Sequence, residues 1–140
     1  MGDADARLFV YGTLLMPAVL HAVCGRRFAT RPARLADFGR YRLRRRVYPA
    51  IVPEAGAQTE GLLCEGLDAA LWRRLDDWES ELYSRHAVVV QGADGAPLAA
   101  CAYVLAAPHH GELERAPWSP EDFERLHLAA YLSRWTVARA

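Results

Sequence analysis

Apolar and polar residues alternate along this chain mainly with the two-residue period of β-strands, and in a few segments with the period of a helix. The first apolar run is RLFVYGTLL, residues 7–15, in which Gly12 interrupts a β-branched and aromatic stretch. Pro17 then starts the segment 17–24 and Gly25 ends it, as in a short helix with proline in its first turn. The pattern predicts a strand, a tight glycine turn and a helix.

The next part of the chain predicts two further strands and a row of arginines. One strand covers residues 33–38, and a second follows in GRYRLRRRVYP, where apolar residues alternate with arginines. The arginines are Arg40, Arg42, Arg44 and Arg46. Their alternation predicts an exposed strand face with acidic neighbours, and favours this over a surface that meets RNA or phosphate. Pro49 is expected to end the strand or to place it at a sheet edge.

A helix and a hairpin are predicted in the second half of the chain. Residues 58–67 form one more strand, which glycines interrupt. Asp68 then caps a helix over 69–78, where apolar residues recur at helical spacing. Residues 83–91 and 98–105 are predicted to be antiparallel strands, since an Asp-Gly turn joins two runs of strand-like residues.

The last part of the chain predicts a loop and a helix. Residues 106–118 are expected to be a loop, and Ser119 followed by proline and two acids starts a C-terminal helix. Several strands with few short helices predict an α+β protein, in which a closed or nearly closed sheet carries helices outside it. We expect one domain over residues 1–140, with a core at about 7–105 and a C-terminal loop and helix at 106–140.

Composition narrows the class of protein. The formal net charge is zero and 24% of the residues are charged, which argues against general affinity for nucleic acid or membrane surfaces. All 17 basic residues are arginine, a bias typical of GC-rich bacterial genomes, and Schiff-base catalysis by lysine is excluded. The acidic start MGDADAR is not expected to act as a signal peptide, because it lacks the basic n-region that precedes the apolar run of such a peptide. Cys24, Cys64 and Cys101 stand among apolar residues and are expected to be buried thiols of a cytoplasmic protein.

Several spaced motifs carry a resemblance to a known family. They are LFVYGTLL at 8–15, Tyr48-Pro49, EGLL at 60–63 and LDDWESELYSRHAVVV at 75–90. In this order they resemble the γ-glutamylcyclotransferase-like family, which includes the AIG2-like proteins, over roughly residues 7–105. The resemblance implies a small mixed β-barrel with short helices packed outside. It also implies an enzyme that cyclises a γ-glutamyl amide and releases pyroglutamate (5-oxoproline) and a free amine, without a metal or other cofactor.

The resemblance also implies the roles of individual residues. Glu79 matches the general base and acid of the family, and Glu81 is a weaker rival for this role. The loop of Tyr11, Gly12, Thr13 and Leu14 matches the oxyanion and carboxylate site, for which successive backbone N–H groups are suited. Further substrate contacts are expected from Tyr48, Tyr83 and Arg85. Arg85 is expected to pair with an acid, either Glu79 or Asp76. The expected partner is a small γ-glutamyl compound.

Other functions stay open at this point. The fold could serve a non-catalytic module that binds a small ligand or a protein, or an amide hydrolase or transferase that uses the same glutamate. His109-His110 is expected to be a solvated pair, because no cysteine or acid stands at a known metal-ligand spacing. A cysteine nucleophile would need a histidine such as His86 or His127 beside it, and is disfavoured.

Overall fold

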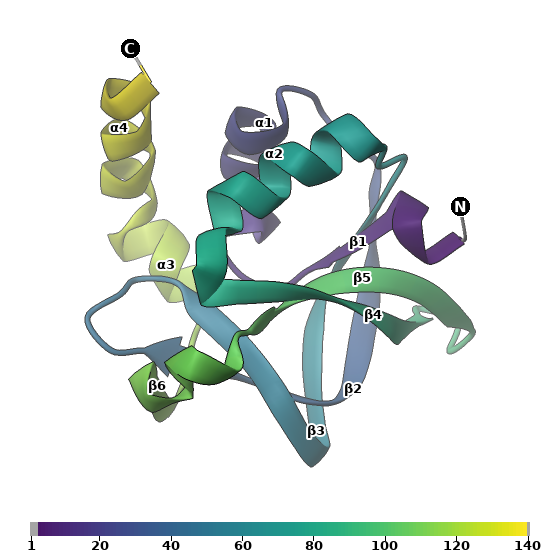
Figure 1. Ribbon diagram of the computed structural model, residues 1–140. Helices are drawn as coiled ribbons and strands as arrows, with labels where there is room; N and C mark the ends of the chain where they lie inside the picture. Colours follow the sequence, from purple (N-terminus) through teal and green to yellow (C-terminus); the bar gives the residue numbers. More distant parts are fainter. Residues whose placement is uncertain (1–2, 140) are drawn as a thin grey trace.

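Five strands form a closed mixed barrel in the structure, a computed structural model that describes the backbone of residues 3–139 and the side chains of residues 4–133 (Figure 1). Around the barrel the order is β1 (Arg7–Val10), β5 (Pro97–Leu105), β4 (Tyr83–Gly92), β2 (Thr30–Leu43) and β3 (Pro49–Glu65), which pairs with β1 again. Only β1 and β5 are parallel, with Leu8 opposite Cys101. The predicted α+β barrel is confirmed.

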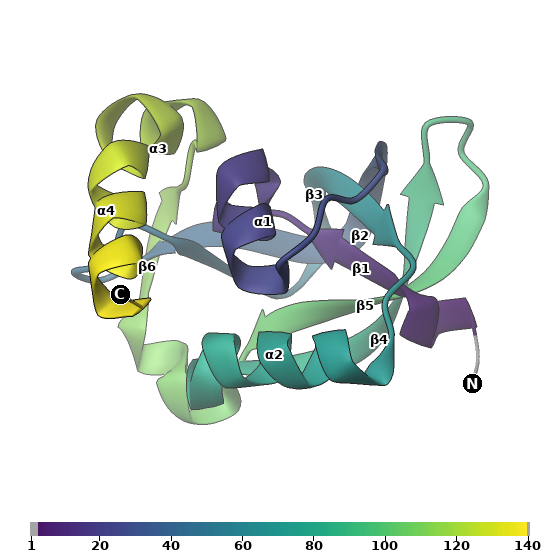
Figure 2. The same ribbon diagram turned by 90° about the horizontal axis from the view of Figure 1, so that it is seen from above.

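Two helices cover one side of the barrel (Figures 1 and 2). The first, α1 (Pro17–Cys24), has proline at its first turn and ends at Gly25, whose φ is 73°. The second, α2 (Ala69–Glu79), is capped by Asp68, whose carboxylate accepts the Leu71 N–H at 2.9 Å. Both helices lie where the sequence predicts them. Among the described residues, no helix is long and apolar enough to cross a membrane.

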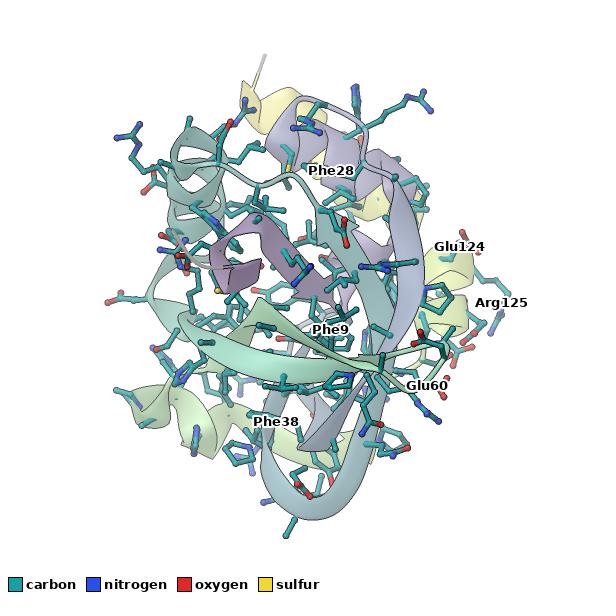
Figure 3. The ribbon with its side chains drawn as sticks, turned by 90° about the vertical axis from the view of Figure 1, so that its right-hand side faces the viewer. Phe9, Phe28, Phe38, Glu60, Glu124 and Arg125 are labelled. Carbon is teal, nitrogen blue, oxygen red and sulfur yellow. The ribbon has the colours of Figure 1, made fainter. Side chains whose placement is uncertain are left out.

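Strand β1 is buried on both of its faces. Phe9 is 1% exposed and points into the barrel interior, where it meets residues of β2, β3, β4 and β5 (Figure 3). Leu8 and Val10 point the other way, into the apolar layer beneath α1 and α2. This explains why the strand is continuously apolar rather than alternating.

The structure corrects the predicted boundaries of β2 and β3. Residues 33–38 and the first arginines belong to one strand, which continues through an irregularity at Asp37, where φ is 64° and the carboxylate accepts the Gly56 N–H at 2.9 Å. The strand ends at Leu43, and the chain turns at Arg45. Pro49 begins β3 rather than ending β2, since a proline can occupy the first position of a strand.

The predicted C-terminal loop and helix are also more structured than expected. Residues 106–118 contain a 3₁₀ segment, η4 (Ala107–Glu112), and a short strand, β6 (Leu113–Pro117), that pairs with β2. Two helices follow, α3 (Pro120–Leu126) and α4 (Leu128–Arg139). Phe123 of α3 packs against Trp118 with ring centroids 5.8 Å apart, while Glu124 and Arg125 face outward (Figure 3). The strand was missed because LERAP has no alternation of apolar and polar residues.

Candidate active site

A cavity of about 320 Å³ opens where β1 ends. Its wall is built from the β1 end and the following 3₁₀ segment η2 (Thr13–Leu15), the start of β3, the end of α2, the starts of β4 and α4, and Tyr103 of β5. Among the described residues that line it, Glu79 is the only acid and Arg46 is the only base. Most of the remaining wall is aromatic or apolar.

Glu79 is the last residue of α2 and is half-buried at the cavity. Burial raises the pKa of its carboxyl group to about 8, and the Asp76 carboxylate, one helical turn earlier, contributes to the rise. The chain then reverses at Ser80, whose φ is 62° and ψ −164°, a conformation that residues other than glycine rarely adopt. An acid with such a pKa can both accept and release a proton near neutral pH. Glu81, the rival, is exposed and does not line the cavity.

The raised pKa of Glu79 predicts a pH dependence of stability. The folded protein holds this proton more tightly than the unfolded chain, so the group stabilises the fold below pH 4.5, its ordinary pKa. This stabilisation is lost as the pH rises towards about 8. We expect Glu79→Gln to flatten the loss in urea unfolding measured between pH 5 and pH 9, because the amide does not titrate. Glu81→Gln should keep the slope of the wild type, and equal slopes in all three proteins would contradict the burial of Glu79.

Asp76 is held by two side chains beside the cavity. The Tyr103 hydroxyl donates to its Oδ1 at 2.7 Å, and Nη2 of Arg85 lies 3.5 Å from its Oδ2. The Arg85 guanidinium also stacks on Trp72, 4.5 Å from the ring centroid. Of the two acids proposed as its partner, Arg85 therefore pairs with Asp76 and not with Glu79. It does not line the cavity, and its contacts in the structure are with Asp76 and Trp72; a contact with substrate stays a prediction.

The predicted tyrosines all lie in the cavity wall, and two of them direct their hydroxyl protons at the backbone. Tyr11 donates to the Tyr103 carbonyl at 2.5 Å, and Tyr83 donates to the Pro49 carbonyl at 2.6 Å. Burial raises the pKa of both hydroxyls well above 10, and the nearby Glu79 carboxylate adds to this. Both side chains therefore stay neutral and rigid, and they shape the wall.

The loop after β1 lies in the cavity wall as the sequence predicts. Gly12, Thr13 and Leu14 line it, and their backbone N–H groups have no hydrogen-bond partner in the described part of the chain. Such N–H groups are suited to bind a carboxylate or an oxyanion. A Cβ atom on Gly12 would lie 3.1 Å from the ring of Pro49, so glycine permits the close approach of these two wall segments.

Two arginines do not lie where the alternating pattern predicts. Arg40 is half-buried and its Nη1 donates to the carbonyl of Tyr11 at 2.8 Å. Arg46 lies beyond the end of β2 and lines the cavity. Only Arg42 and Arg44 are exposed as expected. The pattern failed for Arg46 because the strand ends at Leu43 and the chain then turns. It failed for Arg40 because Trp118 and the Tyr11 carbonyl contact that side chain.

Arg46 is a site residue that the sequence did not single out. Its Nη1 donates to the Tyr48 hydroxyl at 2.7 Å, and its Nη2 donates to Oε1 of Glu112 at 2.8 Å. Nδ1 of His109 lies 2.6 Å from Oε2 of Glu112. Both residues belong to η4, which therefore holds the carboxylate that binds the Arg46 guanidinium. Tyr131 of α4 completes this side of the wall, with its ring centroid 6.4 Å from that of Tyr48. No local signal distinguishes Tyr131 from an ordinary core aromatic.

The remaining candidates take structural positions. The three cysteines are buried and free, and burial raises the pKa of Cys24 to about 11 and that of Cys64 to about 12. These thiols are protonated near neutral pH and are poor nucleophiles. His110 Nε2 lies 3.2 Å from the Leu105 carbonyl, and the described residues contain no cluster of three metal-ligating side chains.

Comparison with known proteins gives consistent matches. The family model described as "Gamma-glutamyl cyclotransferase, AIG2-like" matches residues 8–125. AIG2-like protein D of Arabidopsis thaliana is 32% identical over 127 residues, which span 89% of this chain and 83% of that protein. AIG2-like protein B of the same plant is 27% identical over 130 residues, or 92% of this chain and 75% of that protein. These plant relatives lend no support to the bacterial origin that the arginine bias indicates.

Solved structures show the same fold. A solution structure of an Arabidopsis thaliana protein superposes with a TM-score of 0.72 at 27% identity, over 93% of this chain and 87% of the other. A structure named gamma-glutamyl cyclotransferase superposes with a TM-score of 0.66 at 18% identity, over 94% of this chain and 86% of the other. At 18% identity, the match to the second structure supports the fold alone.

Proposed function

Because the chain belongs to the AIG2-like γ-glutamyl cyclotransferase family, we propose that it cyclises a γ-glutamyl amide and releases 5-oxoproline and a free amine, with Glu79 as base and acid. One observation carries the proposal. The only acid among the described residues lining the cavity has a pKa of about 8, and it shares that cavity with a loop whose N–H groups are unpaired. A base, an acid and an oxyanion site are the parts that this reaction needs.

The proposed reaction is an intramolecular aminolysis. The α-amine of the γ-glutamyl group attacks its own γ-carbonyl carbon, and the Glu79 carboxylate takes the proton that this amine loses. The new C–N bond closes the five-membered ring, while negative charge develops on the carbonyl oxygen and is stabilised by N–H groups of the Gly12–Leu14 loop. The old amide C–N bond then breaks, and Glu79 returns the proton to the departing amine. The net reaction needs no metal, nucleotide or water.

The cavity wall supports a reaction in which water does not compete. The cavity that Glu79 lines is also lined by the rings of Tyr11, Trp78, Tyr83 and Tyr131. An aromatic wall limits access of water to the carbonyl carbon, which favours attack by the tethered amine over hydrolysis. This favours a cyclotransferase over the amide hydrolase that could use the same glutamate.

We also propose that Arg46 selects the amine that leaves. As the only cation in the described wall of the cavity, held by Tyr48 and Glu112, it is suited to bind a carboxylate on the leaving amine. Two compounds that differ only in this group test this: γ-glutamylalanine carries the carboxylate, and γ-glutamylethylamine has a hydrogen in its place. We expect kcat/KM to favour γ-glutamylalanine by roughly tenfold, the worth of a charge-assisted hydrogen bond, and Arg46→Gln to remove the preference.

The matched control is Arg44→Gln, which changes an exposed arginine two residues away. It should keep the preference of the wild type. If Arg46→Gln slows both compounds equally, Arg46 instead binds the α-carboxylate that both compounds share. If it slows neither, Arg46 does not contact the substrate.

A further inference from the structure

Arg40 stands behind the loop that we assign to the oxyanion. It extends from β2, three residues before the strand ends, is half-buried, and stacks on the ring of Trp118 at 5.4 Å from the centroid. Its Nη1 donates to the carbonyl of Tyr11 at 2.8 Å and lies 3.4 Å from the carbonyl of Glu60. Unlike Tyr11, Arg40 does not line the cavity. The guanidinium therefore contacts the loop from outside the cavity wall.

The geometry of one peptide bond connects this contact to the cavity. The described peptide bonds are all trans, so the carbonyl of Tyr11 and the N–H of Gly12 belong to one planar unit and point in opposite directions. Arg40 holds the carbonyl on its own side. The N–H of Gly12 then points away from Arg40, and Gly12 lines the cavity with an N–H that has no partner in the described part of the chain.

The peptide has little freedom to rotate. On the cavity side Gly12 approaches the ring of Pro49 so closely that even a methyl group would meet it at 3.1 Å. The Arg40 guanidinium, which binds the carbonyl of this peptide, packs on the ring of Trp118. A rotated peptide would lose the 2.8 Å hydrogen bond to Arg40 and leave the half-buried guanidinium with only its longer contact to the Glu60 carbonyl, which is unfavourable.

We infer that Arg40 is a positioning residue, which fixes the Tyr11–Gly12 peptide so that the Gly12 N–H faces the reacting carbonyl or the carboxylate of the substrate. This inference rests on the proposed function. A cationic donor on the carbonyl also polarises the whole peptide unit, and this makes the Gly12 N–H a stronger donor. The oxyanion site would thus be supported by a charge that never touches the substrate.

The surroundings of Arg40 favour a role for its charge. Burial lowers the pKa of the guanidinium, and the acids Glu121 and Glu60 offset part of this effect. Packing against Trp118 alone would be served as well by an apolar side chain without the penalty of desolvating a cation. The hydrogen bond to the Tyr11 carbonyl is therefore the reason that we give for a charged residue at position 40.

The test uses Arg40→Met, which keeps the unbranched stem of the side chain but removes the guanidinium and its hydrogen bond. Arg40→Lys keeps a cationic donor, and Arg42→Met is the matched control, an exposed arginine of the same strand. In each protein the amide signal of Gly12 is followed by NMR while 5-oxoproline is added, a molecule that carries a carboxylate and cannot turn over. These readouts do not depend on catalysis.

We expect the Gly12 amide of the wild type and of Arg42→Met to respond to 5-oxoproline, and the Kd to rise roughly tenfold in Arg40→Met. Arg40→Lys should recover part of the affinity. The Gly12 amide shift of the free protein should also differ in Arg40→Met, with the signals of the β4–β5 hairpin unchanged, which a general loss of stability would not produce.

An unchanged Kd and Gly12 shift in Arg40→Met, or no response of Gly12 in the wild type, would overturn the inference. Turnover is measured separately with γ-glutamylalanine. If that compound is cyclised but Arg40→Met behaves as wild type, only the inference fails. If nothing is cyclised while 5-oxoproline binding depends on Arg40, only the proposed function fails.

Discussion

Glu79→Gln is expected to lower the rate of 5-oxoproline release by roughly 10²–10⁴-fold, the usual contribution of a positioned general base. Glutamine has nearly the shape of glutamate and can still accept and donate hydrogen bonds, but it cannot take a proton from the attacking amine. Because the side chain is half-buried in a wall of rings, the isosteric change should leave folding and substrate binding almost intact. The loss should therefore appear in kcat, with little change in the Kd of γ-glutamylalanine.

The control for this prediction is Glu81→Gln, two residues further along the chain. Glu81 is exposed and lies outside the cavity, so its variant should turn over as the wild type does. If Glu79→Gln is fully active, Glu79 is not the proton carrier. If neither the variant nor the wild type releases 5-oxoproline, while both bind γ-glutamyl compounds equally well, the fold serves a binding module.

Gly61→Ala is expected to have the largest effect on stability among simple substitutions in the barrel. Gly61 lies in β3, opposite Ala33 of β2. A Cβ atom at this position would overlap the backbone oxygen of Val10 and lie 2.9 Å from Cζ of Phe9, which is itself buried in the barrel interior. Backbone and ring would both have to move, so we expect the free energy of unfolding to fall by roughly 3 kcal/mol or more.

Urea unfolding measures this effect, and Gly111→Ala is its control. A Cβ at Gly111 would have no neighbour within 4 Å, so the change there should alter stability by only a few tenths of a kcal/mol. Since Val10 directly precedes the Tyr11–Leu14 loop, Gly61→Ala should also reduce 5-oxoproline affinity in the fraction that remains folded. Equal stability of Gly61→Ala and the wild type would mean that β1 and β3 do not approach as closely as described.

The parts of the fold that the sequence predicted well are those with local signals. The proline at the start of α1, the glycine after it and the Asp68 cap of α2 each act within a few residues, and the structure has these helices at the predicted places. The strand before Gly12 was identified because it is continuously apolar, as a strand buried on both faces must be.

The parts that were missed depend on contacts between distant segments. The irregularity at Asp37 is stabilised by the backbone of Gly56, and this partner cannot be found from a window of neighbouring residues. The same holds for Arg40, whose partners are the carbonyl of Tyr11 and the ring of Trp118. Periodicity assigned this arginine to an exposed face because it carries no information about what packs on that face.

The candidate site was predicted from motif resemblance rather than from physical pattern. Glu79 has no distinctive local signal, since a glutamate at a helix end is ordinarily solvated. What makes it unusual is its burial beside Asp76, in a cavity lined by rings from several other parts of the chain. The support of Arg46 by Glu112 is likewise visible only once η4 is folded against the barrel.

The parallel pairing of β1 with β5 has a consequence for the order of folding. The hairpins β2–β3 and β4–β5 each join segments that are adjacent in the chain, whereas β1 must find partners in the middle and in the last third of the sequence. Contacts between distant segments are reached late, because the entropy of closing a long loop is lost before they form. We therefore expect the barrel to close late, through insertion of β1 and pairing of β2 with β4, and β1 brings the Tyr11–Leu14 loop with it. The anion site would come into existence only when the barrel closes, so recovery of 5-oxoproline binding during refolding would report the final step and not the earlier hairpins.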